Sequence, residues 1–229
     1  MSAFDPLRTL AADGKKVRMG RYLLIASLLL WASPGLACSP DGKYRVPTNV
    51  ELLQKADLVV LATVVTGPRT PEEAWSANGE PRVVLRPSRV LKGTSPRELR
   101  VEGILSDQRG RPYPFTPTQL SAVHPSALEG ACIRERYRRG ALVLAMFRRT
   151  PTGYVQLEDV FARSVEDVQG PAALWPRAAE LYLGLLSIKD RATRRSAFLH
   201  EQQRLAAAGS RDDKAIAADI GRYLKATRN

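Results

Sequence analysis

The pattern of apolar and polar residues divides the chain into a strand-rich part and a helical part. Between residues 58 and 65 the sequence LVVLATVV is almost entirely apolar and β-branched, and turn-forming residues follow it. A run this short is atypical of a buried helix, so it predicts the central strand of a sheet. Just before it, Thr48 and Glu51 have the spacing of a capping box, which predicts a short helix over residues 50–56.

Further segments have the composition or the alternation of strands. They are residues 82–91, 98–102, 141–147 and 154–157, and the last two are separated by the hairpin sequence TPTG. Pro87 interrupts the first of these segments, and since proline removes a ladder donor it predicts an edge position or a bulge. Five short antiparallel strands with long connections fit a closed or partly closed barrel, and a sandwich is the alternative.

After residue 171 the apolar period changes from two to about 3.6 residues, which is typical of amphipathic helices. The positions on one helical face are Leu174, Ala178, Leu181, Leu185 and Ile188. Asp190 predicts the cap of a second helix that ends near Gly209. Ser210 and Asp213 predict the start of a third helix.

These elements together predict an α+β fold. It consists of a five-stranded antiparallel OB-like β-barrel followed by a C-terminal helical segment of about three helices. The expected organisation is an export signal over residues 1–37, the barrel over 38–165 and a helical tail over 166–229.

The N-terminal residues have the order of a secretory signal. Basic residues precede the apolar run at 22–32, and Gly35 and Ala37 occupy the small −3 and −1 positions. The run is shorter than the ~20 apolar residues that span a bilayer. We expect cleavage after Ala37, from a start at either Met1 or Met19, and a periplasmic or secreted mature protein.

Cys38 and Cys132 are the two cysteines of the chain. Export places them in an oxidising compartment, where such a pair commonly forms a disulfide. A loop of about 95 residues closed in this way contributes on the order of 4 kcal/mol in the chain-entropy model. The alternative is a lipoprotein that is acylated at Cys38, which would attach the protein to a membrane of the envelope and leave Cys132 as a free thiol.

The chain is basic, with a formal net charge of +12. A basic surface attracts acidic proteins or anionic envelope components, and without a basic run or a nucleic-acid motif we expect no nucleic acid partner. The densest basic set surrounds Tyr137. Its members are Arg134, Arg136, Arg138 and Arg139. An extended backbone would place Arg134, Arg136 and Arg138 on one face, and the set is a candidate anion-binding site.

Several short motifs resemble the netrin-like and tissue-inhibitor-of-metalloproteinase-like group of OB-folds. They are CSP at 38–40, ADLVV at 56–60, VLKG at 90–93, and Cys132 followed by GALVL at 140–144. The resemblance covers residues 38–160 and implies an OB-fold. In inhibitors of that group the amine and carbonyl of the first cysteine chelate the target's zinc, a role that would fall to Cys38. They carry a second cysteine where this chain has Pro40.

The sequence contains few residues that suggest catalysis. His124 and His200 have no metal-ligand spacing, and we expect no metal, no cofactor and no catalytic residue. Ser121 and Ser126 flank His124 outside any Gly-x-Ser-x-Gly setting. We therefore predict a non-enzymatic exported binding module for a protein or envelope component. The alternatives are the lipid-anchored protein and a hydrolase that uses the long 106–131 loop, with His124 as acid or base.

Overall fold

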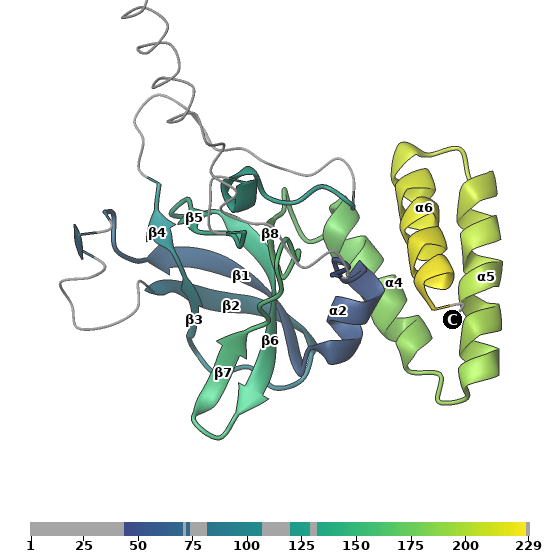
Figure 1. Cartoon of the computed structure of the whole chain (residues 1–229), viewed down its shortest axis with the longest axis horizontal. Coiled ribbons are helices and arrows are strands. Elements are labelled where there is room, and N and C mark those ends of the chain that lie inside the picture. The colour runs from purple at the N-terminus through teal and green to yellow at the C-terminus, as the bar shows by residue number, and fades with distance from the viewer. Residues whose placement is uncertain (1–43, 71, 74–81, 107–119, 129–131, 228–229) are drawn as a thin grey trace, which may run out of the picture. The chain divides into compact units, whose positions relative to one another are not determined.

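The computed structural model describes residues 44–70, 72–73, 82–106, 120–128 and 132–227 (Figure 1). All of these residues belong to one compact unit. The predicted export signal, its cleavage site and Cys38 lie outside the described residues, as does most of the loop expected over 106–131.

The centre of the fold is a six-stranded antiparallel sheet. Five strands follow one another in the order β3-β2-β1-β6-β7, and β8 pairs with β6 beside β7. Their bounds are β1 Leu58–Thr66, β2 Arg82–Lys92, β3 Leu99–Glu102, β6 Leu142–Thr150, β7 Gly153–Gln156 and β8 Val165–Asp167. The sheet curls into a nearly closed barrel, and the predicted α+β class is confirmed.

Three short strands were not among those predicted. β8 makes the sixth strand of the sheet, and β4 (Ile104–Leu105) and β5 (Arg136–Tyr137) form a separate parallel pair. Segments of two or three residues are too short to show alternation. The boundary expected between residues 165 and 166 falls inside β8, which is hydrogen-bonded to β6.

The first five residues of β1, from Leu58 to Ala62, are apolar and are buried on both faces of the strand. Leu58, Val60 and Ala62 point into the barrel interior, whereas Val59 and Leu61 belong to a second cluster formed with the helices. Burying each of these valine and leucine side chains is worth about 1.5–3 kcal/mol. The bulge predicted at Pro87 is present, since the β1–β2 register shifts between Leu61 and Ala62, the partner of Pro87.

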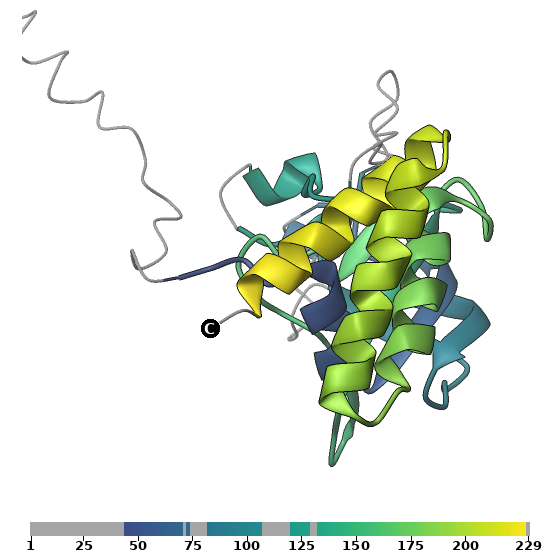
Figure 2. The same cartoon turned by 90° about the vertical axis from the view of Figure 1, so that its right-hand side faces the viewer.

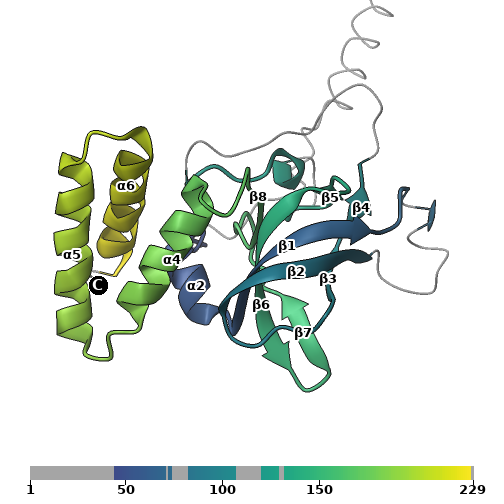
Figure 3. The same ribbon diagram turned by 180° about the vertical axis from the view of Figure 1, so that it is seen from behind.

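Four α-helices occur in the described part of the chain; α2 and α4 lie next to the sheet, and α5 and α6 pack on the far side of these two (Figures 2 and 3). They are α2 Asn49–Lys55, α4 Leu174–Leu186, α5 Arg191–Ala207 and α6 Arg211–Ala226. The capping box of Thr48 and Glu51 is formed, and the predicted caps Asp190 and Ser210 accept hydrogen bonds from Thr193 N and Asp213 N. No described helix meets the length and hydropathy needed to span a membrane.

A buried polar network fixes the helices to the barrel. Asn49 Nδ2 donates to Asp219 Oδ2 of α6 at 2.8 Å, and Arg163 Nε donates to Asn49 Oδ1 at 2.8 Å. Tyr182 of α4 also donates to Asp219 Oδ2, at 2.9 Å. Because buried polar groups are costly without partners, this network selects one docking geometry for the tail.

Candidate functional site

The barrel has a seam between its two outer strands, β3 and β7. The antiparallel order of the sheet makes these two strands parallel to each other, and some of their Cα atoms approach within 8 Å. No backbone hydrogen bond joins Leu99–Glu102 to Gly153–Gln156, both of which are fully described. Within the described residues the backbone edges of these two strands therefore do not pair with each other, and the barrel is not closed here.

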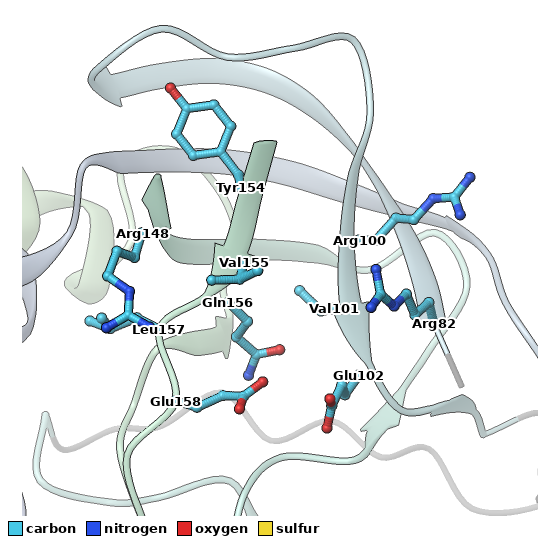
Figure 4. Close-up of a pocket in the computed structure, with 10 residues that line it drawn as sticks. All are labelled: Arg82, Arg100, Val101, Glu102, Arg148, Tyr154, Val155, Gln156, Leu157 and Glu158. Carbon is cyan, nitrogen blue, oxygen red and sulfur yellow. The ribbon is translucent and has the colours of Figure 1, made fainter. Parts of the chain in front are cut away.

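A cavity of about 440 Å³ lies along this seam (Figure 4). Its polar lining combines three arginines, two glutamates and an amide, and these are Arg82, Arg100, Arg148, Glu102, Glu158 and Gln156. In Figure 4 the Gln156 amide points into the space between the two glutamates. Groups of both charges thus line a single concave surface.

Gln156 is a buried polar residue of this cavity whose hydrogen bonding is incomplete. Its side chain is buried, at 7% exposure, and Nε2 makes a long 3.5 Å hydrogen bond to Ser164 Oγ. Its Oε1 is buried and has no hydrogen-bond partner. Leaving such an acceptor unsatisfied costs about 1–3 kcal/mol. Among the exposed arginines of the lining, Arg100 and Arg148 form no ion pair with a described residue.

A second set of polar groups surrounds Asp167 at the end of β8. Arg134 Nη2 donates to Asp167 Oδ1 at 2.8 Å, and its guanidinium lies 4.4 Å from the centre of the Tyr137 ring. His124 Nε2 lies 3.4 Å from Asp167 Oδ2. Burial raises the pKa of Asp167, but Arg134 and His124 together hold that pKa below its ordinary value.

His124 also contacts Ser126, so the structure assembles a serine, a histidine and an aspartate. The backbone N–H of Ser126 donates to Nδ1 at 3.2 Å, which makes Nδ1 an acceptor and places the ring proton on Nε2, facing Asp167. Ser126 Oγ, at 2.8 Å, then donates to Nδ1 as well. These are the donor and acceptor roles of a nucleophilic triad.

The burial of His124 and Ser126 nevertheless prevents a substrate from reaching this triad. His124 and Ser126 are each only 1% exposed. Ser126 Oγ also accepts from the backbone N–H groups of Glu135 and Arg136, at 3.3 and 3.4 Å. Ser126 therefore joins the 3₁₀ helix η1 (Pro125–Leu128) to the segment that enters β5. Because Asp167 is distant in sequence from His124, the contact could not be found from spacing alone.

Glu166 is the most strongly perturbed carboxyl group near this cluster. It is 1% exposed, its Oε2 has no hydrogen-bond partner, and burial is the main reason that its pKa rises to about 8. Nearby Arg134 opposes the shift, and Asp167 adds to it. Glu166 is therefore mostly protonated at neutral pH, because the effect of burial exceeds the attraction of Arg134.

The arginines predicted around Tyr137 do not form one exposed surface. Arg134 is buried and is paired with Asp167, Arg136 is half-buried, and Arg138 and Arg139 are exposed. The extended backbone of β5 is only two residues long, so the alternation that would align the set is absent.

The predicted disulfide lies only partly within the described residues. Cys132 is buried, and no cysteine in this part of the chain is free. Cys38, its expected partner, is outside these residues, so the pairing itself stays a prediction. His200 is exposed on α5, and no group of three metal-ligating His, Cys, Asp or Glu side chains occurs within the described ranges.

No family model, curated protein or solved structure matches this chain. A functional assignment therefore depends on the geometry of the seam and of the Asp167 cluster.

Proposed function

We propose that this chain is an exported, non-enzymatic binding module whose partner docks a peptide-like group in the seam cavity. The observation that carries the proposal is the buried, unpartnered Oε1 of Gln156 inside a mixed-charge concave surface. Buried acceptors are rarely left unsatisfied, and a ligand that donates an N–H at this point would remove the penalty.

The strand order supports an OB-like barrel as the scaffold. In the order β3-β2-β1-β6-β7 the two outer strands are parallel neighbours, which is the arrangement of a five-stranded OB barrel that is not fully closed. OB-folds bind their ligands on the face formed by the second and third strands. In this chain β2 and β3 supply Arg82, Arg100 and Glu102 to the cavity.

The charges in the cavity favour a peptide segment over a purely anionic ligand. A peptide supplies N–H donors for Gln156 Oε1 and, through an acidic side chain or a terminus, a carboxylate for Arg100 or Arg148. Glu102 would disfavour a phosphate that has no positive group beside it, because like charges repel in a partly desolvated site. The partner is accordingly a protein of the envelope or the extracellular space.

The processing of the N-terminus is part of the same proposal. Cleavage after Ala37 would leave Cys38 as the first residue, and a Cys38–Cys132 disulfide would tie that terminus to the segment before β5. Acylation of Cys38 is the competing possibility. The intact mass of the mature protein separates the two, since a diacylglycerol adduct excludes the disulfide.

The test is cross-linked capture of partners from an envelope extract by the full mature protein. We expect Arg100→Ser with Arg148→Ser, or Gln156→Leu alone, to reduce capture by at least about tenfold. The matched control is Arg138→Ser with Arg139→Ser, which removes the same charge away from the seam. Equal capture by the seam variants and the wild type would refute the proposal.

A hydrolase remains the second candidate because Ser126, His124 and Asp167 have the roles of a triad. Their burial weighs against it. Turnover of ester or amide substrates that disappears in His124→Ala, while partner capture is retained, would favour the hydrolase over the binding module.

A further inference from the structure

The helical tail contains a second cavity, separate from the barrel seam. It has a volume of about 590 Å³ and lies where the start of α5, the end of α6 and the end of α2 meet. In Figure 2 the helices α5 and α6 lie on the side nearest the viewer, with α6 running diagonally relative to α5. Gln54, Tyr223 and Thr227 line this cavity. Three arginines of α5 line it as well, and these are Arg191, Arg194 and Arg195.

These arginines are placed where electrostatics disfavours them. Their i, i+3 and i+4 spacing puts three like charges on one helical face, where such pairs destabilise a helix. They also occupy the first turns of α5, where the helix dipole favours anions, and the first turn contains no acidic residue. Asp190 is the N-cap of α5, and its Oδ2 accepts a hydrogen bond from Thr193 N.

The guanidinium groups are held by neutral acceptors rather than by carboxylates. Arg194 Nη1 donates to Ile188 O at 3.0 Å, and Arg195 Nη1 donates to Thr227 Oγ1 at 3.4 Å. Within the described residues none of the three arginines forms an ion pair. Arg194 and Arg195 are thus positioned around the cavity without a carboxylate partner, although Asp190 interacts electrostatically with Arg194.

We infer that this cavity binds a phosphate-bearing anion. The planar guanidinium group of arginine can donate hydrogen bonds to two phosphate oxygens at once. Three guanidinium groups line this cavity, which is more than a single surface ion pair requires. A bound phosphate would relieve both the like-charge repulsion and the unfavourable position on the helix dipole. The same chemistry is offered by a free phosphate and by a phospholipid headgroup. This site is independent of the function proposed for the seam.

The experiment measures the melting temperature of the full mature protein with inorganic phosphate and with chloride, at constant ionic strength. A second arm measures co-sedimentation with phosphatidylcholine vesicles, with and without phosphatidylglycerol. The test variant carries Arg191→Gln, Arg194→Gln and Arg195→Gln. The control variant carries Arg97→Gln, Arg138→Gln and Arg139→Gln, three exposed arginines elsewhere.

We expect phosphate to raise the melting temperature of the wild type and the control, and to bind the test variant at least about tenfold more weakly. Without phosphate the test variant should melt at or above the wild-type temperature, because the repulsion is gone. Vesicle binding that requires phosphatidylglycerol and the three arginines identifies a headgroup as the source, and its absence identifies a free phosphate. An equal response of the test variant and the wild type to phosphate would overturn the inference.

Discussion

The seam cavity and the Asp167 cluster contain the same kinds of side chain, but the partners of these side chains differ. Both contain arginine and carboxylate groups, and both are held by short strands of the barrel. Around Asp167 the charged groups are matched to one another inside the protein. In the seam, Gln156 Oε1 is unmatched and two arginines face solvent. Glu166 Oε2 beside Asp167 is also unmatched, but it is enclosed within the protein, so unmet hydrogen bonding indicates a candidate binding site only where the group lines an open cavity.

Removing Arg134 should have the largest effect on stability. In Arg134→Leu the carboxylate of Asp167 and the carbonyl of Val165 lose their buried cationic partner. Breaking one side of such a pair typically costs about 3–5 kcal/mol, and urea unfolding would measure it. A loss below about 1 kcal/mol would show that the Asp167 cluster is not the matched network described above.

Glu166 should make the stability depend on pH. Its pKa is raised to about 8 by burial, so the folded state binds a proton more tightly than the unfolded state does. Stability should therefore fall as pH rises from about 5 to about 8, by up to about 1.4 kcal/mol per pH unit. Glu166→Gln should abolish this slope. Asp167, whose pKa is lowered, acts in the opposite sense and loses its contribution only in acid.

Ser126→Ala should have a moderate effect that is confined to stability. It removes the hydroxyl that contacts His124 and the backbone N–H groups of Glu135 and Arg136. The expected loss in unfolding free energy is about 1–3 kcal/mol, since these buried groups are left without that partner. Partner capture should be unchanged, and a parallel loss of capture would connect the cluster to function.

Gln156→Leu should have the smallest effect on the isolated protein. The change removes an unsatisfied buried acceptor and keeps a similar volume, so unfolding free energy should change by less than about 1 kcal/mol or rise. A loss above about 2 kcal/mol would mean that the Gln156 amide is satisfied within the fold, which would remove the main evidence for the seam site.

Local patterns were sufficient for the longer elements. The apolar run at 58–65 became β1, and the caps Thr48, Asp190 and Ser210 begin α2, α5 and α6 as expected. Each of these signals acts over a few neighbouring residues, and that range is what a sequence displays directly.

The candidate sites depend on contacts between distant segments. β3 and β7 meet only through barrel closure, and Asp167 reaches His124 only because β8 pairs with β6. The predicted arginine set around Tyr137 was divided by the inward turn of Arg134, which sequence spacing did not reveal. The i, i+3, i+4 spacing of Arg191, Arg194 and Arg195 was visible in the sequence, but the cavity beside them was not.

Partner capture by Gln156→Leu and by Ser126→Ala, measured under identical conditions, separates the seam from the Asp167 cluster as the binding site. We expect Gln156→Leu to remain as stable as the wild type but to lose capture, and Ser126→Ala to be less stable but to retain capture. The opposite result, with capture lost only in Ser126→Ala, would contradict the seam as the site and direct attention to the Asp167 cluster.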